Sequence, residues 1–109
     1  MPLHVPPAVS EYFAAEREND AKRLSRLFAE DGFVRDEGRV HRGREAIRRW
    51  KENVDAKYRY VCEPLAASAK ANTATVRCRL TGDFPGSPVE LDQTFALRGD
   101  RILSLEIHS

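Results

Sequence analysis

Apolar residues in the N-terminal half of the chain recur with the period of an α-helix. The first predicted helix follows Pro6-Pro7, which suit a first helical turn because a missing N–H costs little there. Its buried face consists of Val9, Tyr12, Phe13 and one charged residue, Glu16. The second predicted helix starts at Asp20, a capping residue, and stops at Asp31-Gly32. Its apolar stripe is formed by Ala21, Leu24, Leu27 and Phe28.

A short strand and a third helix are predicted next. The strand covers Phe33 to Asp36, and a loop bracketed by Gly38 and Gly43 follows it. The third helix starts near Gly43. Its apolar face is formed by Ala46, Ile47, Trp50 and Val54, and its other sides carry Arg44, Arg48, Arg49, Lys51 and Glu52.

From Tyr58 onward the apolar period changes to two, which is typical of half-buried antiparallel strands. Turns between the strands are predicted at Asn72, at residues 85–88 and at residues 98–101, the last suiting a two-residue hairpin loop. The positions that alternate on one side are Tyr58, Tyr60, Cys62, Val76, Cys78, Leu80, Val89, Leu91, Gln93, Phe95, Leu97, Leu103, Leu105 and Ile107. Helices followed by a run of strands predict an α+β fold with the helices stacked on one face of the sheet.

Composition limits the class of protein. A chain of 109 residues fits one domain, 1–109. The net charge of +1 gives no electrostatic reason to expect a nucleic acid or a membrane as partner. The N-terminal residues lack the features of a secretory signal, and Cys62 and Cys78 are too few for a disulfide scaffold, so we expect a cytoplasmic protein with reduced thiols. The three histidines are scattered without ligand spacing, which predicts no metal site.

Four segments of the chain resemble the nuclear transport factor 2-like superfamily, in particular its SnoaL-like and ketosteroid isomerase-like branches. They are Tyr12-Phe13-Ala14-Ala15 with Asn19-Asp20, Leu27-Phe28-Ala29-Glu30-Asp31, Val34-Arg35-Asp36 and Gly43-Arg44-Glu45-Ala46-Ile47. The resemblance covers nearly the whole chain. It implies a cone of three N-terminal helices packed on a strongly curved, mostly antiparallel sheet, with a deep apolar pocket between them. It also implies a homodimer that packs sheet against sheet.

The resemblance assigns candidate catalytic roles to residues that lie far apart in the sequence. Asp36 falls at the position of the general base, and Tyr12 at that of an oxyanion-hole phenol. Gln93 falls near a protonated aspartic acid of the steroid isomerases, and this replacement argues against steroid isomerisation itself. His41, in the loop before the third helix, is a further candidate acid or base.

Each candidate also has a structural interpretation. Asp36 can pair with Arg39, Arg42 or Arg44 or cap the third helix, and Tyr12 can be a core tyrosine. Gln93 can line an inert pocket, and a one-residue slip would put Asp92 there instead. His41 can simply be exposed. The residues expected to line the pocket, or to fill the core if there is none, are Phe13, Phe28, Val34, Trp50, Phe84 and Phe95.

Two function classes follow. The first is a cofactor-independent isomerase, cyclase or dehydratase that acts on a small apolar or carbonyl-bearing molecule. The second is a non-catalytic ligand-binding or dimerisation module of the same fold, because this fold hosts both. The first predicts a cavity onto which Asp36 and Tyr12 converge. The second predicts that these side chains pair with the protein itself, or that aromatic side chains fill the pocket.

Overall fold

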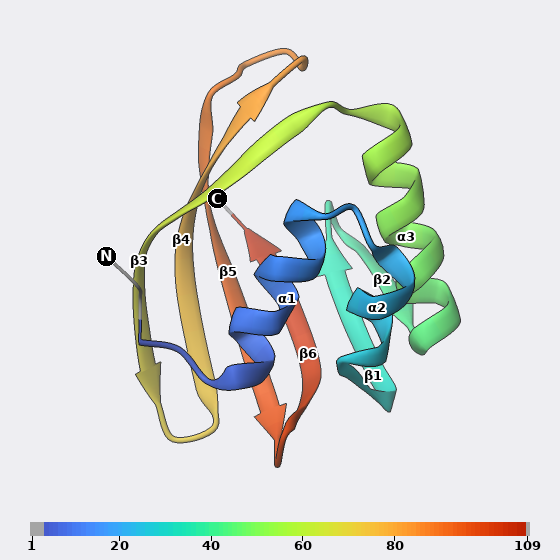
Figure 1. The fold of residues 1–109 in the computed structure, drawn as a ribbon, viewed down its shortest axis with the longest axis vertical. Helices are drawn as coiled ribbons and strands as arrows, with labels where there is room; N and C mark the ends of the chain where they lie inside the picture. Colours follow the sequence, from blue (N-terminus) through green and yellow to red (C-terminus); the bar gives the residue numbers. More distant parts are fainter. Residues whose placement is uncertain (1–3, 109) are drawn as a thin grey trace.

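Three helices and six strands make up the protein (Figure 1). The computed structural model describes residues 4–108; residues 1–3, on which the expectation about a secretory signal partly rests, and residue 109 lie outside it. The helices are α1 (Pro7–Arg17), α2 (Ala21–Arg26) and α3 (Arg44–Lys57). The strands are β1 (Phe28–Asp36), β2 (Arg39–Arg42), β3 (Tyr60–Lys70), β4 (Thr73–Gly82), β5 (Val89–Arg98) and β6 (Arg101–His108).

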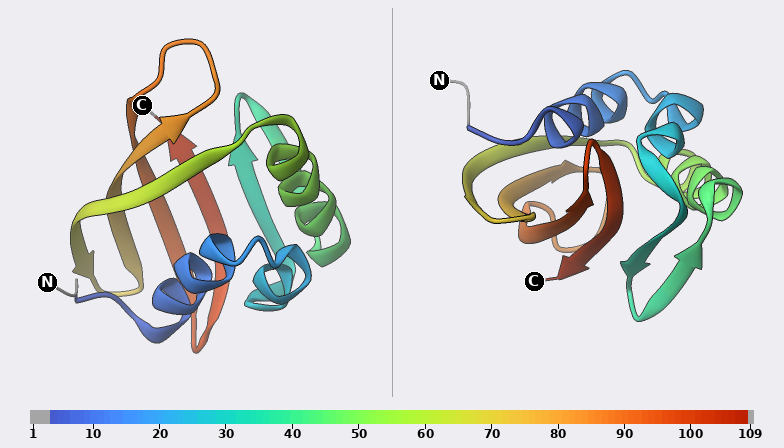
Figure 2. Two further views of the ribbon diagram at one scale, coloured as in Figure 1. Left: turned by 45° about the horizontal axis from the view of Figure 1, so that its top comes forward. Right: turned by 90° about the horizontal axis from the view of Figure 1, so that it is seen from below.

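All strands join one sheet in the order β2-β1-β6-β5-β4-β3. Neighbouring strands are antiparallel except β1 and β6, which run parallel. The sheet is strongly curved, and the helices lie together against it, with α1 across its inner face (Figures 1 and 2). The predicted α+β fold, with N-terminal helices on a mostly antiparallel sheet, is therefore confirmed.

Two predicted boundaries are wrong. The second helix ends at Arg26, so Phe28 belongs to a nine-residue strand that begins where Phe28 pairs with Ile102 of β6. The predicted loop between the bracketing glycines is itself a strand, β2, which forms a hairpin with β1. Pairing with β6 outweighs the local helical pattern at Phe28. Sequence periodicity cannot predict this, because it does not show which segments pair in the folded protein.

The apolar faces predicted for the helices do form the core. On α1, Val9, Tyr12, Phe13 and Glu16 are all buried. The short α2 is capped by Asp20, whose Oδ1 accepts a hydrogen bond of 3.1 Å from the backbone N–H of Arg23. The core residues of all three helices and the sheet form one cluster that includes Leu24, Phe28, Val34, Ile47, Trp50, Ala74, Val76, Cys78, Phe95, Ile102 and Leu105.

Candidate functional site

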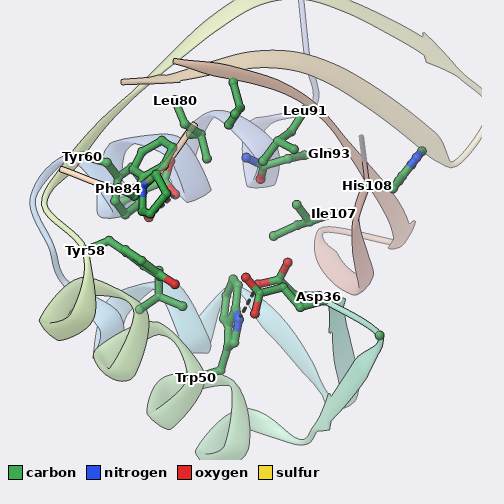
Figure 3. Close-up of a pocket in the computed structure, with 16 residues that line it drawn as sticks. Asp36, Trp50, Tyr58, Tyr60, Leu80, Phe84, Leu91, Gln93, Ile107 and His108 are labelled. Carbon is green, nitrogen blue, oxygen red and sulfur yellow. Dashed lines mark hydrogen bonds between the residues drawn. The ribbon is translucent and has the colours of Figure 1, made fainter. Parts of the chain in front are cut away.

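A cavity of about 570 Å³ lies between α3 and the inner face of the sheet. Its size is that of a pocket for a small organic molecule. Figure 3 shows Tyr58, Tyr60 and Phe84 on one side, Leu91, Gln93 and Ile107 on another, and Asp36 with Trp50 facing them. The lining residues are Glu16, Asp36, Glu37, Gly38, Trp50, Val54, Tyr58, Tyr60, Leu80, Phe84, Pro85, Val89, Leu91, Gln93, Ile107 and His108.

The turn between β1 and β2 positions Asp36. Asp36 is the last residue of β1 and pairs with Arg39, the first of β2. Glu37 and Gly38 make the tight connection with φ of 53° and 75°, a left-handed conformation that glycine adopts readily and glutamate rarely. This hairpin brings the carboxylate of Asp36 to the wall of the cavity.

The environment of Asp36 makes its carboxyl group easier to protonate than that of an exposed aspartate. Burial raises the pKa of Asp36, and the neighbouring Glu37 carboxylate adds to the increase. A hydrogen bond from Trp50 and the charge of His41 act in the opposite direction but do not cancel it. A carboxyl group with a raised pKa beside an apolar cavity is suited to accept and return a proton.

Trp50 holds the carboxylate from α3. Its indole Nε1 donates a hydrogen bond of 3.1 Å to Oδ2 of Asp36. Within residues 4–108 no ion pair joins Asp36 to Arg39, Arg42 or Arg44, the partners that a structural interpretation required. His41 lies outside the lining; its ring centre is 6.0 Å from that of Trp50.

A buried ionic cluster lies behind the wall and includes two lining residues, Glu16 and Tyr60. Lys51 Nζ lies 3.3 Å from Oε2 of Glu16 and 2.9 Å from Oδ1 of Asp55. It also donates a hydrogen bond of 2.6 Å to the hydroxyl of Tyr60. The side chains of Lys51 and Glu16 are only 2% and 9% exposed. Two elements that are distant in sequence, α1 and α3, are thereby joined behind the pocket.

Lys51 is a correction to the sequence analysis, which put it on a solvent-facing side of the third helix. Burial alone lowers the pKa of Lys51, but Glu16, Tyr60 and Asp55 outweigh burial and raise it above the usual value. The ammonium therefore stays charged. A signal was present, because Ile47, Trp50, Lys51 and Val54 follow the i, i+3, i+4, i+7 pattern of one helix face.

Gln93 lines the cavity, and Asp92 does not. Asp92 points to the other side of the sheet, where its Oδ1 lies 3.2 Å from Arg77 Nη1. Gln93 is 3% exposed, and its amide Nε2 lies 3.7 Å from Sγ of Cys78 and 3.9 Å from Sγ of Cys62. Its Oε1 is buried without a hydrogen-bond partner in the described residues.

Tyr12 is a core residue and does not line the cavity. Its ring packs edge-on against Phe13, Phe28 and Phe95, with centroid distances of 5.3, 6.4 and 5.1 Å. Its hydroxyl is buried and has no hydrogen-bond partner in residues 4–108. Burial, together with the nearby Glu16 charge, raises the pKa of Tyr12 well above its usual value. Asp36 and Tyr12 therefore do not converge on one open cavity.

The expected aromatic lining is divided between pocket and core. Trp50 and Phe84 line the cavity. Phe13, Phe28, Val34 and Phe95 instead belong to the core cluster beneath it, because they lie on the faces that α1, β1 and β5 turn toward one another. The sequence analysis did not single out Tyr58 and Tyr60 as pocket residues, although both lie on the apolar side of the predicted strand pattern.

Figure 3 shows the hydroxyl end of Tyr58 directed into the cavity, toward the side of Trp50 and Asp36. Tyr58 directly follows the last residue of α3, where the backbone becomes extended. The described residues contain no cluster of three or more side chains suited to hold a metal ion. Across residues 4–108, every helix is too short or too polar to span a membrane.

Comparison with known families identifies the domain. Residues 9–104 match the profile of the SnoaL-like domain. The chain belongs to the SnoaL-like family. No protein of curated function matches the sequence of this SnoaL-like domain.

Solved structures agree with this assignment. A candidate polyketide cyclase from Sinorhizobium meliloti is 42% identical, with a TM-score of 0.92 over 95% of each chain. A protein with a ketosteroid isomerase-like fold from Catenulispora acidiphila, solved with trimethylamine, is 26% identical; its TM-score is 0.85 over 97% of this chain and 87% of that one. The epoxide hydrolase/cyclase-like enzyme SalBIII, described with pyran ring formation in the polyether salinomycin, shares the fold at 21% identity, with a TM-score of 0.79 over 93% and 86%.

Proposed function

We propose that this SnoaL-like protein binds a small carbonyl-bearing or cyclic molecule and moves a proton on it, as a cofactor-independent isomerase, cyclase or dehydratase. One observation carries the proposal: Asp36, with a raised pKa, lines an apolar cavity of about 570 Å³. A base in such a position typically contributes about 10²–10⁴-fold in rate.

The proposed reaction assigns a role to each polar group at the cavity. The ionised Asp36 takes a proton from a carbon next to a carbonyl, and the electrons of the broken C–H bond form an enolate. The hydroxyl of Tyr58, directed into the cavity, donates a hydrogen bond to the enolate oxygen. Protonated Asp36 then returns the proton to another carbon of the ligand. Trp50 keeps the carboxylate in place through its 3.1 Å hydrogen bond.

The predicted roles of Tyr12, Gln93 and His41 are revised in this proposal. The Tyr12 hydroxyl is sealed in the core, so it supports the pocket from behind and does not contact the ligand. Gln93 lines the wall opposite Asp36 and orients the ligand. His41 packs against Trp50 and acts on Asp36 only through its charge.

The relatives support a small-molecule enzyme. The 42% identical protein is a candidate polyketide cyclase, and the more distant SalBIII is epoxide hydrolase/cyclase-like. Both descriptions concern reactions of small organic molecules. The trimethylamine bound to the Catenulispora protein supports the view that a member of this fold accepts a small organic molecule.

A non-catalytic ligand-binding module is the second candidate. The burial of Tyr12 favours this candidate. In an isomerase of this fold the phenol would point at a substrate oxygen, whereas the Tyr12 hydroxyl is buried in the core. On this alternative Asp36 serves only as a hydrogen-bond acceptor for Trp50 and for the ligand.

Hydrogen exchange at carbon separates the two candidates without knowledge of the product. The protein is incubated in heavy water with cyclohexanone and with a β,γ-unsaturated cyclic ketone, and deuterium at the α-carbon is followed by NMR. The enzyme proposal predicts exchange above the buffer rate that is lost in Asp36→Asn. Ketone binding with no added exchange would favour the binding module.

We also propose a homodimer through the outer face of the sheet. That face carries paired charges across neighbouring strands, among them Arg77 with Glu90 and Asp92, and Arg79 with Glu63. Light scattering at the exit of a size-exclusion column gives the mass directly. A mass of one chain at high protein concentration would contradict the dimer.

A further inference from the structure

We propose that the pocket selects a ligand that carries a protonated amine, with its apolar part against the aliphatic wall. This inference rests on the proposed function, because it names the class of molecule that the same pocket takes.

Carboxylates predominate among the ionisable residues of the lining. Glu16, Asp36 and Glu37 are carboxylates, the imidazole of His108 is the one basic side chain, and neither lysine nor arginine lines the cavity among the described residues. Residues behind the wall do not reverse this balance. Lys51 and Lys57 are the ammonium groups next to the lining tyrosines, and Asp55 adds a further carboxylate beside Lys51. Among these groups, carboxylates outnumber ammonium groups by four to two, and the imidazoles of His108 in the lining and of His41 beside Asp36 do not exceed the remaining difference.

The unsatisfied polar atoms of the lining have the same character. Oε1 of Glu16 and Oε1 of Gln93 are buried without a hydrogen-bond partner in residues 4–108. Both are acceptors, and both residues are more than nine-tenths buried. In a poorly solvated wall, uncompensated acceptor oxygens favour a positive charge in the adjacent cavity and oppose a negative one.

Aromatic rings in the cavity lining also favour a cation. Trp50, Tyr58, Tyr60 and Phe84 line the cavity from two sides (Figure 3). An ammonium group is attracted to the face of such rings. The structure already contains this contact twice, with Lys51 Nζ 5.1 Å from the centre of the Tyr60 ring and Lys57 Nζ 5.2 Å from that of Tyr58.

The opposite wall is aliphatic and explains where the rest of the ligand lies. Leu80, Val89, Leu91 and Ile107 come from β4, β5 and β6 on the inner side of the sheet. They provide apolar surface for a hydrocarbon part of the ligand. The pocket therefore fits an amphiphilic amine better than a carboxylic acid or a fully polar molecule.

The test compares three probes of similar size and different charge: phenethylamine, phenethyl alcohol and hydrocinnamate. Trp50 is the one tryptophan of the chain and lines the cavity, so its fluorescence reports binding. At neutral pH we expect the amine to bind at least about tenfold more tightly than the alcohol, and hydrocinnamate to bind most weakly. Glu37→Gln should reduce the preference for the amine, and Glu63→Gln, an exposed carboxylate outside the lining, should not.

Three results would overturn the inference: equal or tighter binding of the alcohol, tighter binding of hydrocinnamate, or no binding of the amine. The outcome is independent of the proton-transfer proposal, because binding is measured without turnover. If a neutral ketone exchanges its α-hydrogen through Asp36 while phenethylamine does not bind, only the amine inference fails. If phenethylamine binds as expected while Asp36→Asn leaves exchange intact, only the proton-transfer proposal fails.

Discussion

The indole Nε1 of Trp50 donates a 3.1 Å hydrogen bond to Oδ2 of Asp36 and so joins α3 to the end of β1 at the pocket. This bond lowers the pKa of Asp36, while burial and Glu37 raise it, and the net direction is upward. The pKa of the proposed base thus results from two opposing effects, burial with Glu37 on one side and the Trp50 hydrogen bond on the other.

Trp50→Phe should move the acid limb of activity to higher pH. The phenyl ring fills most of the space but cannot donate the hydrogen bond, so the pKa of Asp36 rises further. Because a base must be ionised, a higher pKa means that activity is lost at a higher pH as the solution is acidified. The check is a pH profile of hydrogen exchange for both proteins. Superimposable profiles would show that the bond does not tune Asp36.

Trp50→Ala tests the packing of the same residue. Trp50 is 7% exposed and belongs to the core cluster, so its truncation should cost about 3–5 kcal/mol of unfolding free energy. Urea unfolding measures this value. A cost well below about 1 kcal/mol would mean that the ring contributes to the cavity wall but not to the core.

Asp36→Asn should change how stability depends on pH. The pKa of Asp36 is raised in the folded protein, so the folded state binds more protons than the unfolded chain between about pH 4 and the folded pKa. The free energy of unfolding therefore falls as pH rises through this window. Asp36→Asn does not undergo this loss, so its free energy of unfolding at neutral pH should be at least as large as that of the wild type. The difference between the two proteins should shrink at acidic pH. Urea titrations at several pH values check this, and a variant that is less stable at neutral pH would contradict it.

Lys51→Met should be strongly destabilising. Removal of the ammonium leaves Glu16, which is 9% exposed, and Asp55 without their partner, and breaking a buried pair typically costs about 3–5 kcal/mol. Arg48→Met is the matched control, because Arg48 lies on the same helix in an exposed pair with Glu52 and should cost less than about 1 kcal/mol. Adding Glu16→Gln to Lys51→Met should recover part of the loss. Equal costs for the two single variants would argue against the buried cluster.

Two tyrosine variants distinguish a hydroxyl buried in the core, that of Tyr12, from one that lines the pocket, that of Tyr58. Tyr12→Phe removes a buried hydroxyl that has no partner in residues 4–108, so the free energy of unfolding should rise by about 1 kcal/mol with exchange activity unchanged. Tyr58→Phe removes the proposed oxyanion donor and should lower the exchange rate by about 10²-fold with little change in stability. The opposite pattern would return the oxyanion role to Tyr12.

Much of the fold is readable from periodicity. Val9, Tyr12 and Phe13 repeat at helical spacing and are buried, and the alternation on β4 and β5 puts Val76, Cys78 and Phe95 inside. The end of the second helix is not readable, because Phe28 satisfies both a helical stripe and a strand that pairs with β6. Only the tertiary partner decides between them.

The site is less predictable than the fold. Asp36 and Gln93 reach one cavity because a hairpin turn and a strand register bring them there. Tyr12 has the spacing of a core residue and packs as one, so the role implied by family resemblance does not follow from its position. Lys51 lies on the apolar stripe of α3, but a charged residue at such a position is usually solvated, and its burial depends on Glu16 from another helix.

The most direct test of the central claim is the rate of α-carbon hydrogen exchange in wild type and Asp36→Asn, measured on one ketone at one neutral pH. Glu63→Gln is the matched control, because it removes an exposed carboxylate that lies outside the cavity lining. If Asp36 is the base, Asp36→Asn lowers the enzymatic rate by about 10²-fold or more, and Glu63→Gln retains nearly all of it. Equal exchange in wild type and Asp36→Asn would contradict the assignment of Asp36 as the base.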